Sequence, residues 1–143
     1  MPRMLFINLP VTDVAKATDF YRSIGAEKNE AFSNEDSSSL ALSDNLFVMV
    51  HSHARFRDFT PKAIADARTS TEMLLCLSSE SRQCVDLLVE AAGSAGGRID
   101  PCPRQEHDMM YGRSFEDLDG HIWEVVWMDP AMADAPPETP TAA

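Results

Sequence analysis

The stretch DLDGHIWEVV, residues 117–126, places a carboxylate in the middle of an apolar segment. If residues 122–128 form a strand, Glu124 shares one face with Ile122 and Val126, because side chains alternate between the two faces of a sheet. A carboxylate taken out of water without a partner costs several kcal/mol, so it recruits a cation or hydrogen-bond donors, or its pKa rises. Glu124 is therefore the first candidate for chemistry.

The four histidines are the next candidates. His107 lies in the polar stretch RQEHDMMYG, where it could cover a cavity and act as a general base, or remain a surface loop residue. His51 and His53 form an HxH pair of the kind that binds metals, but we favour the end of a strand facing solvent. We expect His121, directly after Gly120, to occupy a turn or the surface.

Tyr111 and Arg113, in MMYGRSF, alternate onto one strand face together with Phe115. If that face points inward, Arg113 could clamp an anionic substrate or neutralise Glu124, and Tyr111 could donate a hydrogen bond. If it points outward, the two residues form an ordinary sheet surface. The sequence leaves both alternatives open.

Composition limits the partners that such a site could have. The chain has 143 residues, 12 Lys and Arg against 23 Asp and Glu, and a net charge of −11, which repels nucleic acid. Its first apolar run is too short for a signal segment or a membrane span, which predicts a cytoplasmic protein without a membrane partner. Three cysteines without CxxC spacing indicate reduced thiols.

The same order of elements occurs twice, at a spacing of about 66 to 76 residues, which indicates a duplicated module. The expected elements of the first copy are a strand at 4–9, a helix from 14 capped by Thr12-Asp13, and strands at 40–43 and 46–50. Those of the second copy are a strand at 72–77, a helix at 82–95, and strands at 98–99, 111–116 and 122–128. On the second helix, the expected inner face is Cys84, Leu87, Leu88 and Ala91.

These elements divide the chain into four segments. We expect a first βαβββ module at 1–55, a connecting segment at 56–70 with a short helix starting at Thr60-Pro61, and a second βαβββ module at 71–128. Residues 129–143 are rich in Pro, Ala and acid, and are expected to form a mobile tail.

The paired strand and helix pattern, the helix DVAKATDFYRSIG and the turn DLDGHIWEV resemble the vicinal oxygen chelate superfamily over residues 4–128. Its members include glyoxalase I, extradiol dioxygenases, fosfomycin-resistance proteins and bleomycin-binding proteins. The stretches FYRSIGA, RFRDFTPKAIADA, TEMLLCLS and YGRSFEDLDGHIWEVVWMDP are similar to a bacterial branch labelled predicted lactoylglutathione lyase. The resemblance implies an α+β fold of paired βαβββ modules that form a half-open barrel around a small-molecule cavity, in a homodimer.

Superfamily enzymes place metal ligands on the first and last strands of each module. The matching positions here are Phe6 and Val48 in the first module, and Glu72 and Glu124 in the second. Phe6 and Val48 cannot coordinate a metal, so the resemblance makes them substrate-contacting residues, with Asn8 beside Phe6. Two converging carboxylates resist ionising together, and a divalent metal such as Zn, Ni, Fe or Mn would relieve both.

The ligand set is half missing, and Asn8, His51 or His107 would have to complete it. Three functions follow from the resemblance. The first is a metal-dependent enzyme of the glyoxalase or dioxygenase type, with Glu124 as metal ligand or base. The second is a metal-free protein that binds a hydrophobic or cationic small molecule, as bleomycin-binding proteins do. The third is a dimeric scaffold whose cavity has lost its function.

Overall fold

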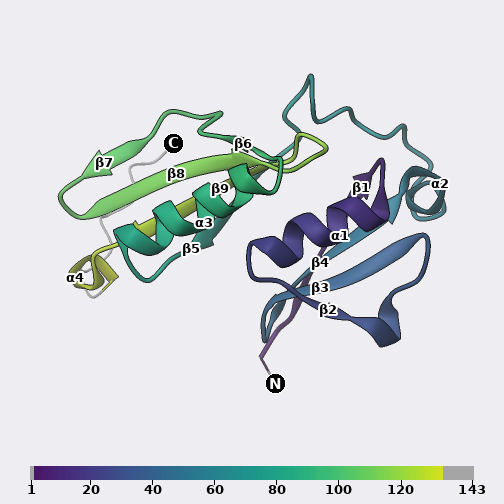
Figure 1. Ribbon diagram of the computed structural model, residues 1–143, viewed down its shortest axis with the longest axis horizontal. Helices are drawn as coiled ribbons and strands as arrows, with labels where there is room; N and C mark the ends of the chain where they lie inside the picture. Colours follow the sequence, from purple (N-terminus) through teal and green to yellow (C-terminus); the bar gives the residue numbers. More distant parts are fainter. Residues whose placement is uncertain (1, 134–143) are drawn as a thin grey trace, which may run out of the picture.

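A computed structural model describes residues 2–133 as two sheets that lie side by side, each with a helix against one face (Figure 1). The first half contains β1 (Leu5–Val11), α1 (Val14–Ser23), β2 (Glu27–Asn29), the 3-10 helix η1 (Glu30–Phe32), β3 (Ser37–Ser43), β4 (Leu46–Ser52) and α2 (His53–Phe56). The second half contains β5 (Leu74–Ser78), α3 (Arg82–Ser94), β6 (Arg98–Ile99), β7 (Gln105–His107), β8 (Met110–Glu116), β9 (Ile122–Met128) and α4 (Pro130–Ala133).

Both sheets have the same strand order. The first runs β1-β4-β3-β2 and the second runs β5-β9-β8-β6, with β7 also paired to β8. In each half the first strand pairs in parallel with the last, β1 with β4 and β5 with β9, and the other pairs are antiparallel. Neither sheet closes on itself, so the predicted α+β fold with a half-open barrel architecture is confirmed.

Helix α1 begins where the sequence indicates. The Asp13 side chain accepts a hydrogen bond from the Lys16 backbone N–H at 3.0 Å, which satisfies one of the free donors of the first turn. Gly25 follows the helix with a φ of +105°, a conformation that glycine adopts without steric cost. The cap and the stop together fix the length of α1.

The buried face of α3 differs from the expected one. Val85, Val89 and Ala92 are fully buried against the second sheet, whereas Leu87 is 58% exposed. The segment CVDLLVEAA carries apolar residues around most of the helix, so its periodicity does not define one face. Packing against β8 and β9 chooses the face instead.

An aromatic cluster joins the two halves. Phe20 and Tyr21 project from α1, and Phe115 of β8 stacks on Trp123 of β9 with ring centroids 6.3 Å apart. Phe20 lies 6.0 Å from Phe115, and Tyr21 lies 6.0 Å from Trp123. The rings of all four residues are almost fully buried, so one core extends across both sheets.

The turn between β8 and β9 bonds the second half to the first. Asp117 accepts a hydrogen bond from the Tyr21 hydroxyl. One oxygen of Asp119 accepts hydrogen bonds from the backbone N–H and the hydroxyl of Thr12, at 2.8 and 2.9 Å. The DLDG sequence thus forms the hairpin turn and also hydrogen-bonds the second half of the chain to the first.

Two expectations about chain segments have different outcomes. The expected helix at Thr60-Pro61 is wrong, because the helix of this region is α2, which ends at Phe56 and is capped by the Ser52 hydroxyl. The expected mobile tail falls mainly on residues 134–143, which lie outside the described residues, while Pro130–Ala133 form α4.

Candidate functional site

The open face of the first sheet, on the side away from α1, carries a cavity of about 520 Å³. Strand register determines which side chains face it: Phe6 lies opposite Phe47, and Asn8 lies opposite Met49. The Phe6 and Phe47 rings stack with centroids 5.0 Å apart and an interplanar angle of 13°. The lining residues are Met4, Phe6, Asn8, Asn29, Phe32, Ser39, Phe47 and Met49.

Val48 does not line this cavity. It is fully buried on the face that packs against α1, together with Val50 of the same strand. Side chains alternate between the two faces of a strand, so Val48, which lies between Phe47 and Met49, points away from the cavity that those two residues line. Phe6 and Asn8, by contrast, both line the cavity.

His51 supports the polar end of this open face, and it is not at a solvent-facing strand end as expected. Its side chain is buried, with Nε2 2.8 Å from Asn8 Oδ1 and Nδ1 2.6 Å from the Ser37 hydroxyl. Burial lowers the pKa of His51, and the nearby Arg55 charge lowers it further. A neutral imidazole therefore donates to Asn8 and accepts from Ser37, which leaves the Asn8 amide N–H groups available to a ligand.

The open face of the second sheet presents Glu124. This half-buried residue lies opposite Cys76 on β5 and opposite Ser114 on β8. Burial and the Glu124 charge raise the pKa of the Cys76 thiol, which favours its protonated form. The β5 side chain that meets Glu124 in the sheet is therefore Cys76.

Glu72 takes part in a different interaction. It precedes β5, and its carboxylate lies 3.0 Å from His121 Nδ1, while His121 Nε2 lies 2.8 Å from the Pro10 carbonyl oxygen. Burial alone would lower the pKa of His121, but Asp117, the Pro10 carbonyl and Glu72 raise it above its usual value. His121 thus lies in the β8–β9 turn as expected, but it is buried at the junction of the two halves and not on the surface, and the acceptors at both ring nitrogens favour its protonated form.

The proposed carboxylate pair was the basis of the predicted metal site, and the structure does not bring Glu72 and Glu124 together. The Glu72 carboxylate contacts His121 instead. The residue that lies opposite Glu124 is Cys76, four positions after Glu72 along the chain. Within residues 2–133, no group of three or more His, Cys, Asp and Glu side chains could hold a metal ion. The donor set that residues 2–133 of one chain supply therefore does not fit a divalent metal.

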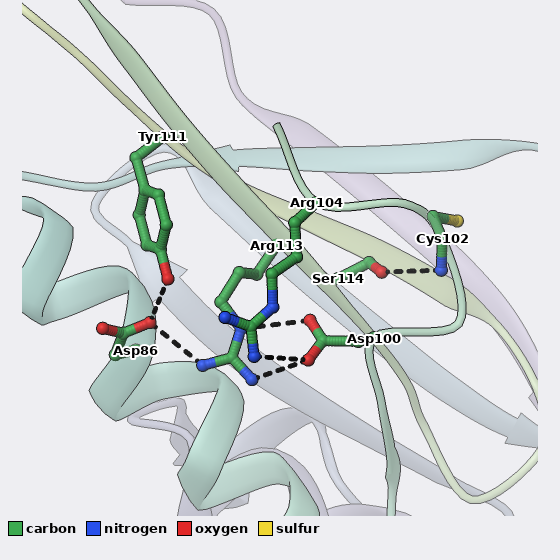
Figure 2. Close-up of polar contacts among 7 residues, drawn as sticks. All are labelled: Asp86, Asp100, Cys102, Arg104, Tyr111, Arg113 and Ser114. Atoms are coloured by element: carbon green, nitrogen blue, oxygen red, sulfur yellow. Dashed lines mark hydrogen bonds and ion pairs between the residues drawn. The ribbon is translucent and has the colours of Figure 1, made fainter. Parts of the chain in front are cut away.

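Tyr111 and Arg113 face α3 on the side of the sheet opposite to Glu124. Arg113 forms two hydrogen bonds with Asp100, at 3.0 and 2.8 Å, and one with Asp86 of α3 at 3.0 Å. The Tyr111 hydroxyl donates to the same Asp86 oxygen at 2.6 Å. Figure 2 shows this network. The side-chain hydrogen bonds of Arg113 go to Asp86 and Asp100, and Arg113 does not line the first-sheet cavity.

His107 is remote from both open-face candidates. It lies in the short strand β7, with an exposed side chain and with its backbone carbonyl accepting a hydrogen bond from Arg82 at 2.6 Å. Arg82 also lies over the rings of Tyr111 and Trp127 and so holds this hairpin in place. The contacts of His107 are those of a hairpin residue.

Comparison with known proteins assigns the architecture. Residues 3–125 match the Glyoxalase/Bleomycin resistance protein/Dioxygenase superfamily. The chain belongs to this superfamily. No curated protein matches the chain.

Solved structures of the superfamily's fold agree with this membership. A hypothetical protein from S. aureus is 23% identical, covers 89% of this chain and 94% of its own length, and has a TM-score of 0.73. A glyoxalase-related enzyme from Fulvimarina pelagi is 20% identical, covers 89% and 88%, and has a TM-score of 0.72. A fosfomycin resistance protein from Mesorhizobium loti is 12% identical, covers 94% and 99%, and has a TM-score of 0.67. At these identities the likeness shows the fold alone.

The sequence analysis did not identify several residues that line the first-sheet cavity: Asn29, Phe32, Ser39, Phe47 and Met49. The signal that could have found Phe47 and Met49 is the parallel register of β1 and β4. Phe32 and Asn29 come from η1 and the end of β2, and no periodicity in the sequence marks them. Their position depends on how that segment folds back over the sheet.

Proposed function

We propose that this superfamily member binds an uncharged, flat aromatic small molecule in the cavity of the first sheet, without a metal held by this chain alone. The observation that carries the proposal is the cavity itself, whose volume of about 520 Å³ falls in the range of small-molecule sites. Its walls are three phenylalanines and two methionines, with Asn8, Asn29 and Ser39 as the polar groups.

The chemistry of these walls selects the ligand class. Offset stacking on the paired rings of Phe6 and Phe47 favours a flat aromatic group. Methionine side chains adapt to different ligand shapes, and Met4 and Met49 lie on the cavity wall. The Asn8 amide, held by His51 through its oxygen, offers its N–H groups to an acceptor on the ligand. The residues that line the cavity include no Asp or Glu, so a cation gains no ion pair there.

A methionine-methyl NMR titration with the uncharged probe N-phenyl-1-naphthylamine tests the proposal. The methyl signals of Met4 and Met49 should shift, while those of Met73 and Met128, exposed elsewhere, should not. Probe fluorescence should show binding about ten-fold weaker in Phe6→Ala, which removes one stacking ring. Leu87→Ala is the matched control, because Leu87 is 58% exposed on α3, away from the open faces, and Phe6 is 50% exposed.

Two results would overturn this function. One is a shift confined to the methyls of Met73 and Met128, which would place the probe on another surface. The other is an equal loss of affinity in Phe6→Ala and Leu87→Ala, which would indicate nonspecific binding to exposed apolar groups.

A second candidate function is a metal-dependent enzyme of the glyoxalase type, with Glu124 as metal ligand or base. Glu124 favours it, because this half-buried carboxylate sits on an open sheet face where a ligand would approach. The similarity to predicted lactoylglutathione lyases stays a prediction. Metal analysis of protein purified without chelator, combined with Glu124→Gln, tests this function. Stoichiometric metal that disappears in a folded Glu124→Gln variant supports it, and absence of metal after reconstitution refutes it.

A homodimer is part of the same proposal. Large apolar side chains remain exposed on or beside the open faces of both sheets, including Phe6, Phe32, Leu74 and Met128. A second copy that covers these faces would remove them from water. Light scattering of the purified protein measures the mass directly. None of the helices in residues 2–133 has the length and apolar character that a membrane crossing requires, and a cytoplasmic location stays a prediction from the sequence.

A further inference from the structure

A second cavity, of about 400 Å³, lies where the connecting segment meets the β8–β9 turn and the end of β1. We call it the junction cavity. It begins at Pro10 and Thr12, beyond the part of β1 that lines the first-sheet cavity, and the two cavities share no lining residue. Its walls include Arg57, Arg68, Asp119 and His121, together with residues 63–67 of the connecting segment.

From its walls we infer that the junction cavity binds a small anion through a carboxylate or phosphate group. Two arginines line it, and none of the ion pairs in residues 2–133 uses Arg57. Arg68 lies 3.6 Å from Asp119, too long for a hydrogen bond, so its guanidinium N–H groups can turn to a ligand. Arginine presents several N–H donors in a planar fork, which matches the oxygens of a carboxylate or phosphate.

The acids near these arginines already have donors. Asp119 Oδ1 accepts two hydrogen bonds from Thr12. Asp66 Oδ1 accepts one from the Arg68 backbone N–H at 3.0 Å. His121 also lines the wall, and both of its ring nitrogens are occupied by Glu72 and the Pro10 carbonyl. An incoming anion would therefore meet arginine donors that the protein leaves uncommitted.

The backbone of the connecting segment supplies an independent observation. Residues 63–67 all line the junction cavity, and within the described chain none of their backbone N–H groups donates a hydrogen bond to another backbone carbonyl. Backbone N–H groups without an acceptor in the protein remain able to donate to a ligand. Ala63, Ile64 and Ala65 add apolar surface, which suits an organic anion with a short hydrocarbon part.

The segment is held rigidly enough to form a wall. Gly120 has a φ of +91°, and a Cβ placed there would lie 2.9 Å from the backbone of Ala67 and Arg68. Only a residue without a side chain allows the β8–β9 turn to pack so closely against this segment. The turn therefore fixes the position of Arg68 relative to Asp119 and His121.

Backbone amide NMR with inorganic phosphate and, separately, propionate as probes tests the inference. Saturable shifts should occur at the amides of residues 63–68, and the methyls of Met4 and Met49 should stay in place. Arg57→Gln should weaken binding of the preferred probe at least about five-fold, because it removes one of the two guanidinium groups that line the cavity. Arg22→Gln, which removes one charge from an exposed position on α1, is the matched control and should leave affinity within about two-fold.

The two probes separate the possible ligand classes. Tighter binding of phosphate assigns the site to phosphorylated compounds, and tighter binding of propionate assigns it to carboxylates. Absence of saturable shifts at residues 63–68 with both probes would overturn the inference. Equal weakening by Arg57→Gln and Arg22→Gln would also overturn it, since that result reflects net charge alone.

Discussion

Arg113→Met removes the guanidinium that ties α3 and the loop after β6 to β8. Arg113 is 4% exposed at its side chain and makes three hydrogen bonds to Asp86 and Asp100 (Figure 2). Methionine has a similar length and keeps the apolar packing of the stem, so the variant tests the charge and the hydrogen bonds rather than the volume.

The expected loss follows from the burial of each partner. Removing one member of a buried ion pair costs about 3 to 5 kcal/mol, mostly because the remaining charge lacks a partner. Asp100 and Asp86 are 22% and 42% exposed at their side chains, so water can solvate them in part. We therefore expect a loss of about 3 kcal/mol, which for a domain of this size lowers Tm by about 10 °C.

Acid provides a second measure of the same network. The Arg113 hydrogen bond holds the pKa of Asp100 below its usual value, and the Tyr111 hydrogen bond does so for Asp86. Depressed carboxyl pKa values contribute stability that is present above about pH 4 and is lost as pH falls through the folded-state values. Arg113→Met should flatten this acid-dependent loss.

Urea unfolding at pH 7, repeated between about pH 2.5 and 5, measures both effects. Asp100→Asn and the double variant complete a cycle that isolates the coupling between Arg113 and Asp100. A loss below about 1 kcal/mol at pH 7 would refute the structural role. The structural role would also be refuted if Arg113→Met kept its stability but no longer bound the aromatic probe. Arg113 would then contact the ligand directly, as the inward-facing alternative in the sequence analysis proposed.

The β8–β9 turn supplies the remaining predictions. Gly120→Ala should cost about 3 kcal/mol, since alanine is strained at a φ of +91° and its Cβ collides with the backbone at Ala67; a urea midpoint equal to wild type would contradict this. The raised pKa of His121 predicts that its stabilisation is complete below about pH 6.5 and is lost as pH rises through the folded-state value. Unfolding measured between about pH 6 and 9 should therefore show a decline in wild type that His121→Gln lacks, and parallel curves would show that folding does not raise the pKa of His121.

The architecture was accessible from the sequence because its signals are local. The Asp13 cap and Gly25 mark both ends of α1, and the duplicated order of strands and helices indicates two equivalent sheets. Each of these signals depends on neighbours within a few residues along the chain. The same helix and DLDG turn carried the resemblance to the superfamily, which the match over residues 3–125 confirms.

The direction of individual side chains was less accessible. Placing Val48 rather than Phe47 or Met49 at the cavity is an error of one residue, and on a strand one residue reverses the face. The partners of Glu72 and Arg113 were equally hidden, because His121 and Asp86 are 49 and 27 positions away. No local pattern states which distant group will meet a charged side chain.

The sequence by itself determined the main helices and strands, their repeated order and the fold, because caps, turns and hydrophobic periodicity act over a few residues. Only the tertiary structure decided that Glu72 bonds His121, that Glu124 lies beside Cys76, and that His51 holds Asn8 at a cavity. These contacts join residues far apart in the chain, and a buried charge or imidazole is stabilised by whichever partners packing brings within about 3 Å.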